Sequence, residues 1–279
     1  MTLFTNIKSF DKSFLLKLWL SLILYQLSVC PVSAQKDTMD IKDYILIINT
    51  YTESFPWTNR LISTATNFVK DDPKLAVYTE HMNMIMIDND SILDQFKDSL
   101  FDRYGSHRPR MLLLLGNSSL ILKDDLRKMW GDIPMVLCAG KDYTGPEHYY
   151  LTKQPIPLSE RVPLAELSQS CNLTYLYANL YIHENVEMMF RTLPRMKRFI
   201  YVGDERFVNQ VNSQEIQEIL RTKHPDVHYT FLSSRDIKKT NQLIDSLNFV
   251  DPRTTGILFS SWFHKRQFAG NMMLTMILP

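Results

Sequence analysis

The sequence predicts a two-lobed α/β protein built on parallel sheets. Three observations predict this class. Short, fully apolar runs recur along the chain, as parallel strands buried on both faces require. Stretches with apolar residues at helical spacing lie between these runs. An irregular interval from about residue 141 to 183 separates two such alternating series, and strands that alternate with helices form parallel sheets covered on both faces.

The first series begins with the apolar run from Tyr44 to Ile48, which ends at Asn49. Pro56 opens a helical pattern, and Asp71-Asp72-Pro73 ends it. Ser91 is placed to cap a second helix. We expect strands at 44–48, 75–86, 111–115 and 134–138, and helices at 56–70, 91–104 and after 119 to about 130.

The second series repeats the alternation after the irregular interval. We expect helices at 184–193, 210–223 and 235–247, strands at 198–202, 227–232 and 255–259, and a last helix from Gln267. These elements predict a first lobe at 41–150, a crossover at 151–183 with a hinge near 140–145, and a partial second lobe at 184–279.

The N-terminal segment has the pattern of a secretory signal. Three lysines stand ahead of an apolar run from Leu18 to Val29, and the small residues Val32-Ser33-Ala34 follow it. This pattern predicts a signal peptide at 1–34 and an exported, periplasmic protein. The alternative is that the segment is retained and anchors the chain in the inner membrane, although its apolar run is shorter than the ~20 residues that span a bilayer.

Composition excludes several classes of protein. The chain has 31 basic and 30 acidic residues and a net charge of +1, unlike a strongly basic nucleic-acid binder. Three cysteines are too few for a disulfide scaffold. No glycine-rich phosphate motif follows any predicted strand, so we expect no nucleotide cofactor and no nucleic-acid partner.

The candidate site lies where the predicted strands end, because ligands of open α/β sheets bind beyond the carboxyl ends of the strands. The residues there are small, hydroxylic, amide-bearing or aromatic, which suits hydrogen bonding and stacking on a small molecule. For any one of them, ordinary turn chemistry is the alternative explanation. The candidates are Asn49, Thr50, Tyr51, Trp57, Gly116, Asn117, Ser118, Ala139, Gly140, Gly203, Asp204, Ser260, Ser261 and Trp262.

These candidates predict binding without catalysis or a metal. We expect substitution of Asn49, Asn117 or Trp262 to weaken ligand binding with little loss of fold. A remote alternative is an exported α/β hydrolase that uses Ser118, but Leu120 stands where a nucleophile elbow has its second glycine. His183 and Glu187 have the spacing of two metal ligands on a helix, but no third ligand is marked.

Two stretches carry a resemblance to a known family. They are Tyr44 to Tyr51 followed by Phe55-Pro56-Trp57, and Glu184 to Pro194 followed by the strand Arg198 to Asp204. Over about residues 41–265 the chain resembles the extracytoplasmic sensor domain of Bacteroides-type, often hybrid, two-component histidine kinases. That domain is similar to the substrate-binding components of ABC transporters, which have the type I periplasmic-binding-protein fold.

The resemblance implies a two-lobed clamp that closes on a small ligand and passes the closure to a downstream kinase module. The alternative partner is an ABC permease, which a free periplasmic binding protein would serve, and a homodimer is left open. The sensors that the chain resembles continue through the rest of the second lobe, a transmembrane helix and kinase modules. We therefore expect the second lobe to be incomplete and the chain to be truncated.

Overall fold

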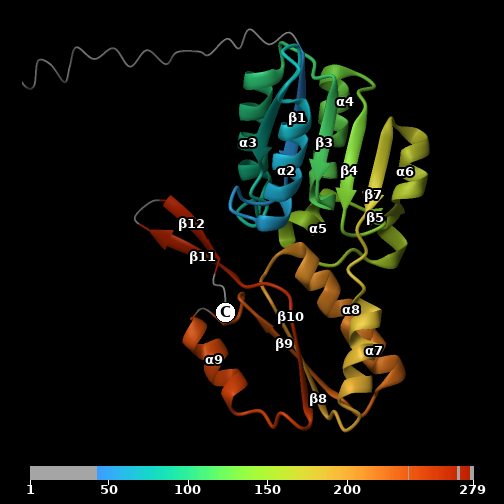
Figure 1. The fold of residues 1–279 in the computed structure, drawn as a ribbon, viewed down its shortest axis with the longest axis vertical. Helices are drawn as coiled ribbons and strands as arrows, with labels where there is room; N and C mark the ends of the chain where they lie inside the picture. The colour runs from blue at the N-terminus through green and yellow to red at the C-terminus, as the bar shows by residue number, and fades with distance from the viewer. Residues whose placement is uncertain (1–42, 238, 269–270, 277–279) are drawn as a thin grey trace, which may run out of the picture. The chain divides into compact units, whose positions relative to one another are not determined.

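The computed structural model describes residues 43–237, 239–268 and 271–276, and the side chains of these ranges as far as Phe263 (Figure 1). The chain divides into the units Met1–Asp40 and Ile41–Pro279, and the described residues belong to the second. The predicted signal peptide at 1–34 lies outside the described residues. Within those ranges, no helix is both long and apolar enough to cross a membrane.

The order of elements confirms the predicted α/β class. The strands are β1 (Tyr44–Asn49), β2 (Ala76–His81), β3 (Met111–Leu115), β4 (Met135–Ala139), β5 (Tyr143–Thr144), β6 (Val162–Pro163), β7 (Leu173–Tyr177), β8 (Arg198–Gly203), β9 (His228–Ser233), β10 (Thr255–Phe259), β11 (Phe263–Phe268) and β12 (Asn271–Met276). The helices are α2 (Pro56–Val69), α3 (Asp90–Tyr104), η1 (Asn117–Leu122), α4 (Lys123–Trp130), α5 (Glu147–Thr152), η2 (Leu158–Glu160), α6 (Leu164–Ser170), α7 (Ile182–Thr192), α8 (Phe207–Lys223) and α9 (Thr240–Asn248).

The first sheet is five-stranded and parallel, in the order β2-β1-β3-β4-β7. Its central strands are the apolar runs, and they are buried because both faces are covered. Leu46 and Leu112 lie in a core cluster with residues of α3, α4 and α6, whereas Ile47 packs with residues of α2 on the opposite face. This two-sided burial explains why the strands show continuous rather than alternating apolar sequence.

The second sheet is three-stranded and parallel, in the order β10-β8-β9. Phe199 and Tyr201 of β8 pack with α7 and α8, whereas Ile200 and Val202 pack with α9. Its order, read from the other edge, is the same as that of the first three strands of the first sheet. In both sheets the chain reverses its direction of winding beside the first strand, at β1 in one and β8 in the other, which is where open α/β sheets bind ligands.

The boundary between the halves differs from the predicted one. β7 pairs with β4 as an outer strand of the first sheet, and α5 and α6 precede it, so the first half extends to Tyr177 and not to 150. The sequence concealed β7 because Thr174, Leu176 and Tyr177 of this edge strand are exposed, which leaves no continuous apolar run. The chain crosses to the second sheet at 178–181 rather than throughout 151–183.

Two further predictions are wrong. The last stretch contains the antiparallel pair β11 and β12 instead of a helix. The predicted hinge segment 140–145 lies within the first half of the chain. Tyr143 and Thr144 pair with β6 inside the first half, so this segment is not the connection between the sheets.

Candidate functional site

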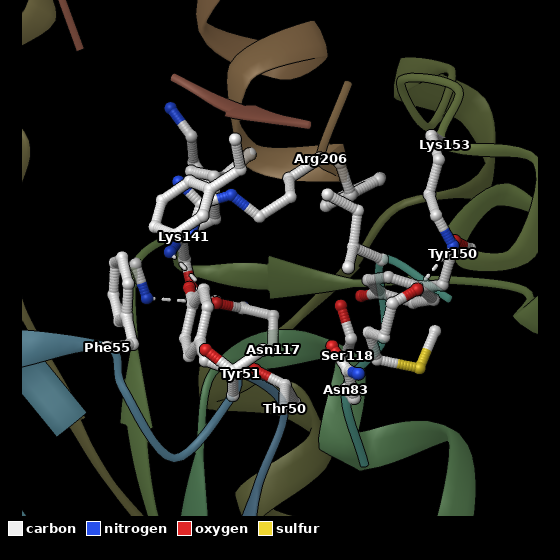
Figure 2. Close-up of a pocket in the computed structure, with 17 residues that line it drawn as sticks. Thr50, Tyr51, Phe55, Asn83, Asn117, Ser118, Lys141, Tyr150, Lys153 and Arg206 are labelled. Atoms are coloured by element: carbon white, nitrogen blue, oxygen red, sulfur yellow. Dashed lines mark hydrogen bonds between the residues drawn. The ribbon is translucent and has the colours of Figure 1, made fainter. Parts of the chain in front are cut away.

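A pocket lies at the carboxyl ends of the strands of both sheets (Figure 2). Its empty volume is about 730 Å³, counting the part that opens to solvent, which is the size of a small-molecule site. Residues that follow β1, β2, β3 and β4 line it from the first half, and the start of α8 and of β11 line it from the second. Five of the lining side chains are aromatic: Tyr51, Phe55, Tyr150, Phe207 and Phe263.

The two sheets present equivalent residues to this pocket. Asn49 ends β1, and its side-chain oxygen accepts a hydrogen bond from the main-chain N–H of Tyr51 at 3.1 Å. Asp204 follows β8, and its Oδ1 accepts in the same way from the N–H of Arg206, also at 3.1 Å. These side-chain turns place Tyr51 and Arg206 at matching positions of the two halves. The guanidinium carbon of Arg206 lies 5.5 Å from the centre of the Tyr51 ring.

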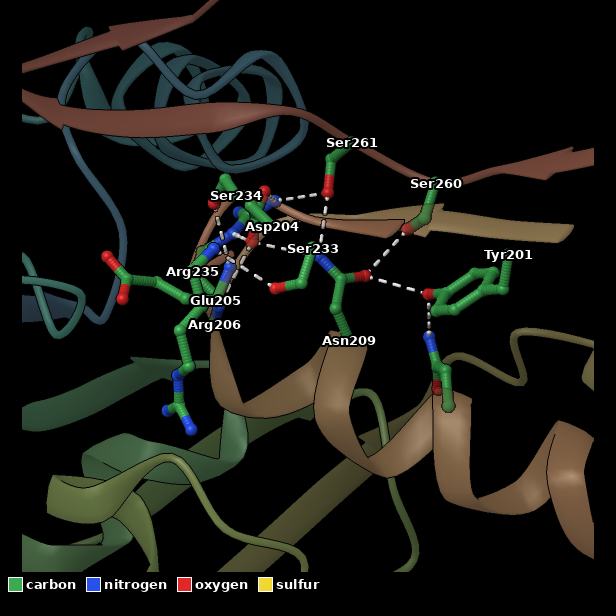
Figure 3. A network of polar contacts seen from close by, with 11 residues as sticks. Tyr201, Asp204, Glu205, Arg206, Asn209, Ser233, Ser234, Arg235, Ser260 and Ser261 are labelled. Atoms are coloured by element: carbon green, nitrogen blue, oxygen red, sulfur yellow. Dashed lines mark hydrogen bonds and ion pairs between the residues drawn. The ribbon is translucent and has the colours of Figure 1, made fainter. Parts of the chain in front are cut away.

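Arg206 is held by groups from both halves of the chain. Its Nε and Nη2 donate to the two carboxylate oxygens of Asp204 at 2.8 and 2.9 Å, and Nη2 also donates to the Ser261 hydroxyl at 2.7 Å (Figure 3). The guanidinium lies over the rings of Phe55 at 4.8 Å and Phe263 at 4.5 Å. Phe55 belongs to the first half, so this cation–π contact joins the two halves beside the pocket.

A buried network of hydrogen bonds around Asn209 holds Asp204 in place. Asn209 of α8 is fully buried and donates from Nδ2 to Asp204 at 2.8 Å and to Ser261 at 3.0 Å. Its Oδ1 accepts from the hydroxyls of Tyr201 at 2.9 Å and Ser260 at 2.8 Å (Figure 3). All four hydrogen bonds of this amide are made, so the network fixes the ends of β8 and β10 together.

Asn117 has the same kind of role in the first half. Its Nδ2 donates to the main-chain oxygens of Lys141 and Tyr143 at 2.8 and 2.9 Å, and its Oδ1 accepts from the main-chain N–H groups of Gly140 and Lys141 at 2.9 and 3.2 Å. The amide therefore clamps the loop after β4 to the start of η1. It lines the pocket, but its hydrogen-bonding capacity is already used.

The turn between β3 and η1 requires a glycine. Gly116 has φ +94°, a conformation that strains other residues, and a Cβ there would lie 2.4 Å from the Thr50 hydroxyl. The close approach brings the ends of β1 and β3 together at the floor of the pocket. Burial raises the pKa of the neighbouring Tyr51, and the positive charge of Arg206 partly offsets that rise.

Two lysines line the pocket, and the ammonium group of each already has partners within the protein. Lys141 makes an ion pair with Glu215 of α8 at 2.7 Å, a second charged contact between the halves. Lys153 is 5% exposed, and its ammonium donates to the main-chain oxygens of Met84, Ile87 and Tyr150 at 2.6, 2.5 and 3.2 Å. An ammonium group has three donors, so these carbonyl oxygens use all of them.

The structure brings five of the predicted candidates to the pocket and places the others elsewhere. Lining residues among them are Thr50, Tyr51, Asn117, Ser118 and Gly140. Asn49, Gly116 and Ala139 are buried in turns and core of the first half, and Gly203, Asp204, Ser260 and Ser261 lie around the Arg206 network. Trp57 is 38% exposed on α2, and Trp262 is 2% exposed in the core beneath α9.

These positions change the predicted effects of substitution. Asn49 is fully buried and bonded to Thr58 and His81, and Trp262 packs in a core cluster, so neither lines the pocket. We expect their substitution to disturb folding first, contrary to the expectation from sequence. Whether the five lining candidates contact a ligand stays a prediction.

Several lining residues were missed by sequence reasoning. They come from the segments after β1, β2 and β4, from α5 and the residue after it, and from the starts of α8 and β11. They are Thr52, Phe55, Asn83, Met84, Ile85, Lys141, Tyr150, Lys153, Arg206, Phe207, Val208 and Phe263. One signal was available. Asn49 and Asp204 each stand at a strand end, and the residue two positions later is the one that turns toward the pocket.

The described residues offer little for the catalytic alternative. Within them, the Ser118 hydroxyl has no hydrogen bond to a histidine or carboxylate, although it lines the pocket. No group of three His, Cys, Asp or Glu side chains in the described ranges is placed to hold a metal ion. His183 and Glu187 instead meet Lys223 at the surface. Cys138 and Cys171 are both buried free thiols.

Comparison with known proteins includes a distant likeness to a solved structure. No protein-family model matches the sequence, and no curated protein does. A solved structure described as the ligand-free, open structure of CD0873, a substrate binding protein with adhesive properties from Clostridium difficile, has a TM-score of 0.42 and 11% sequence identity to this chain. The likeness covers 77% of this chain and 65% of that chain, so this chain spans less than two thirds of its length. The fold class stated above therefore rests on the chain's own sheets: α/β, with parallel five- and three-stranded sheets.

Proposed function

We propose that this chain is an extracytoplasmic clamp that binds a small molecule, and that it serves as the sensor domain of a two-component receptor. One observation carries the binding function. The strands of two parallel sheets with matching strand order have their carboxyl ends at one pocket. Equivalent side-chain turns at Asn49 and Asp204 place Tyr51 beside Arg206 there. Ligand sites of α/β sheets occur at such edges.

The contacts between the halves support a clamp. Arg206 against Phe55 and Lys141 with Glu215 are side-chain contacts, and Tyr150 and Phe207 meet with ring centres 4.6 Å apart. Contacts of this kind are individually weak enough to break and re-form as a ligand enters and leaves. The exposed crossover at 178–181 is the segment best placed to absorb the change in backbone angles.

Binding is tested by a thermal-shift screen of the full chain against a library of small metabolites, with the pocket blocked by Ser118→Phe. A compound present at about a hundred times its Kd stabilises the folded state by about 2.7 kcal/mol, or roughly 5–10 °C in Tm. We expect such shifts in the wild type and their loss in Ser118→Phe.

The matched control is Ser63→Phe, which adds the same ring on the exposed side of α2, outside the pocket. We expect it to respond to ligands as the wild type does. A library without a single stabilising compound, or shifts of equal size in Ser118→Phe, would contradict binding in this pocket.

The sensor role is supported by the resemblance at Tyr44 to Trp57 and Glu184 to Asp204, and the ABC-transporter role is the alternative. The genomic reading frame after codon 279 separates the two. A transmembrane helix and kinase module in that frame would support the sensor, whereas neighbouring permease and ATPase genes would support the transporter. Export is tested by locating the full chain in cell fractions, with the periplasmic or membrane fraction expected.

A further inference from the structure

The side chain of Asn83 is an unexplained polar group in the lining of the pocket. Its Oδ1 is buried and has no hydrogen-bond partner among the described residues. An unsatisfied buried acceptor costs about 1–3 kcal/mol. Other buried side-chain atoms of the described residues also lack a partner, Asn212 Oδ1 and Gln210 Nε2 among them, but of this group only Asn83 lines the pocket.

The backbone holds Asn83 firmly in this position. Its φ is +52°, in the left-handed region that asparagine tolerates better than most residues. The main-chain N–H groups of Met82 and Met84, on either side, donate to the oxygens of Asn49 and Thr50 at 2.8 and 2.9 Å. The loop is therefore tied to the end of β1, and the unpartnered oxygen belongs to a fixed part of the pocket (Figure 2).

The charges around the pocket disfavour an anion. The guanidinium of Arg206 is matched by the carboxylate of Asp204, and the ammonium of Lys141 by Glu215. Lys153 gives its three donors to main-chain oxygens. A carboxylate or phosphate entering the pocket would have to displace these partners, and it would also face the acceptor oxygen of Asn83.

We infer that the pocket takes an uncharged ring compound that carries an N–H or O–H donor, and that Asn83 Oδ1 accepts that hydrogen bond. This inference rests on the proposed binding function. The apolar side chains of Met84, Ile85, Phe207 and Val208 line the same pocket and would bury the faces of the ring. The donor satisfies the oxygen that the protein leaves without a partner.

The class of ligand is tested with matched pairs of compounds that share a ring. Nicotinamide and nicotinate form one pair, and glucose and glucuronate form the other. In each pair the first member is neutral and the second is a carboxylate. Binding to the full chain at millimolar concentration is measured by saturation-transfer NMR and calorimetry, and we expect the neutral member of at least one pair to bind ten times more tightly or better.

Tighter binding of the carboxylates, or no binding by any member of either pair, would overturn the inferred class. The proposed binding function would still stand if the metabolite screen yields compounds whose effect is lost in Ser118→Phe. The two failures are therefore distinguishable, because the screen is not restricted to neutral rings.

The role of Asn83 is tested with two variants. Asn83→Gly removes the amide and keeps the left-handed backbone without strain, so we expect an unchanged or higher Tm and at least tenfold weaker binding of the neutral compound. Asn83→Asp keeps an acceptor oxygen at the same place, so we expect it to bind that compound within a few fold of the wild type. Wild-type affinity in Asn83→Gly, or an equal loss in both variants, would overturn the role assigned to this oxygen.

Discussion

Replacing Arg206 by alanine is expected to destabilise the protein by about 3 kcal/mol, because it leaves a buried carboxylate without the positive charge that pairs with it. Asp204 is fully buried, and the guanidinium of Arg206 donates to both of its oxygens, whereas Asn209 Nδ2 and the main-chain N–H of Arg206 are neutral donors to Oδ1. The substitution also removes the guanidinium that lies over the rings of Phe55 and Phe263, which loosens the contact between the halves. Urea unfolding followed by circular dichroism measures the loss.

A double-mutant cycle separates the ion pair from the stacking. Asp204→Asn with Arg206→Met removes both charges, so we expect the double variant to be more stable than Arg206→Met alone. Arg253→Ala is the control, since Arg253 pairs with Asp251 at the surface and is 89% exposed. We expect no measurable change there. A loss in Arg206→Ala no larger than in Arg253→Ala would contradict a buried, partner-dependent carboxylate.

Asn117→Ala is expected to cost about 3 kcal/mol of stability, since several main-chain groups lose their partners at once. The amide satisfies two carbonyl oxygens and two N–H groups of the loop after β4. Asn117→Asp does not restore stability, because one carboxylate oxygen would face the two carbonyl oxygens. Both variants are measured by urea unfolding, and ligand affinity is measured on the folded fraction.

The control for this prediction is Asn172→Ala. Asn172 is exposed between α6 and β7, and its side chain makes no hydrogen bond within the described residues. We expect wild-type stability from this variant. If Asn117→Ala folds with wild-type stability and only loses affinity, the residue is a ligand contact, as the sequence alone suggested, and the clamp assigned to it is wrong.

The sequence predicted correctly the strands that are buried on both faces of a sheet. β1, β3, β4 and β8 are covered on both faces, so their residues form continuous apolar runs. β7 at the edge of the first sheet has exposed side chains, and its place beside β4 depends on a tertiary contact that leaves no local pattern. The terminal hairpin was mistaken for a helix because an apolar run alone does not separate the two.

For the site, the sequence predicted the correct edge of both sheets. It did not predict which residues at that edge hold the loops and which face the pocket. A polar residue at a strand end can hold a loop or face a ligand. The side chains of Asn49, Asn117 and Asp204 hold loops through hydrogen bonds to main-chain groups. The side chains that face the pocket stand further along, in Phe55, Asn83 and Arg206. Their positions follow from turns and from contacts between the halves, which spacing in one sequence does not reveal.

The central claim is that residues from the ends of both sheets bind one ligand. Hydrogen–deuterium exchange of the full chain, with and without the screened compound that raises Tm most, tests it most directly. We expect slower exchange in 50–55, 83–85 and 204–211 together, because these segments border the pocket from both halves. Protection confined to the ends of one sheet, or located away from these segments, would contradict the claim.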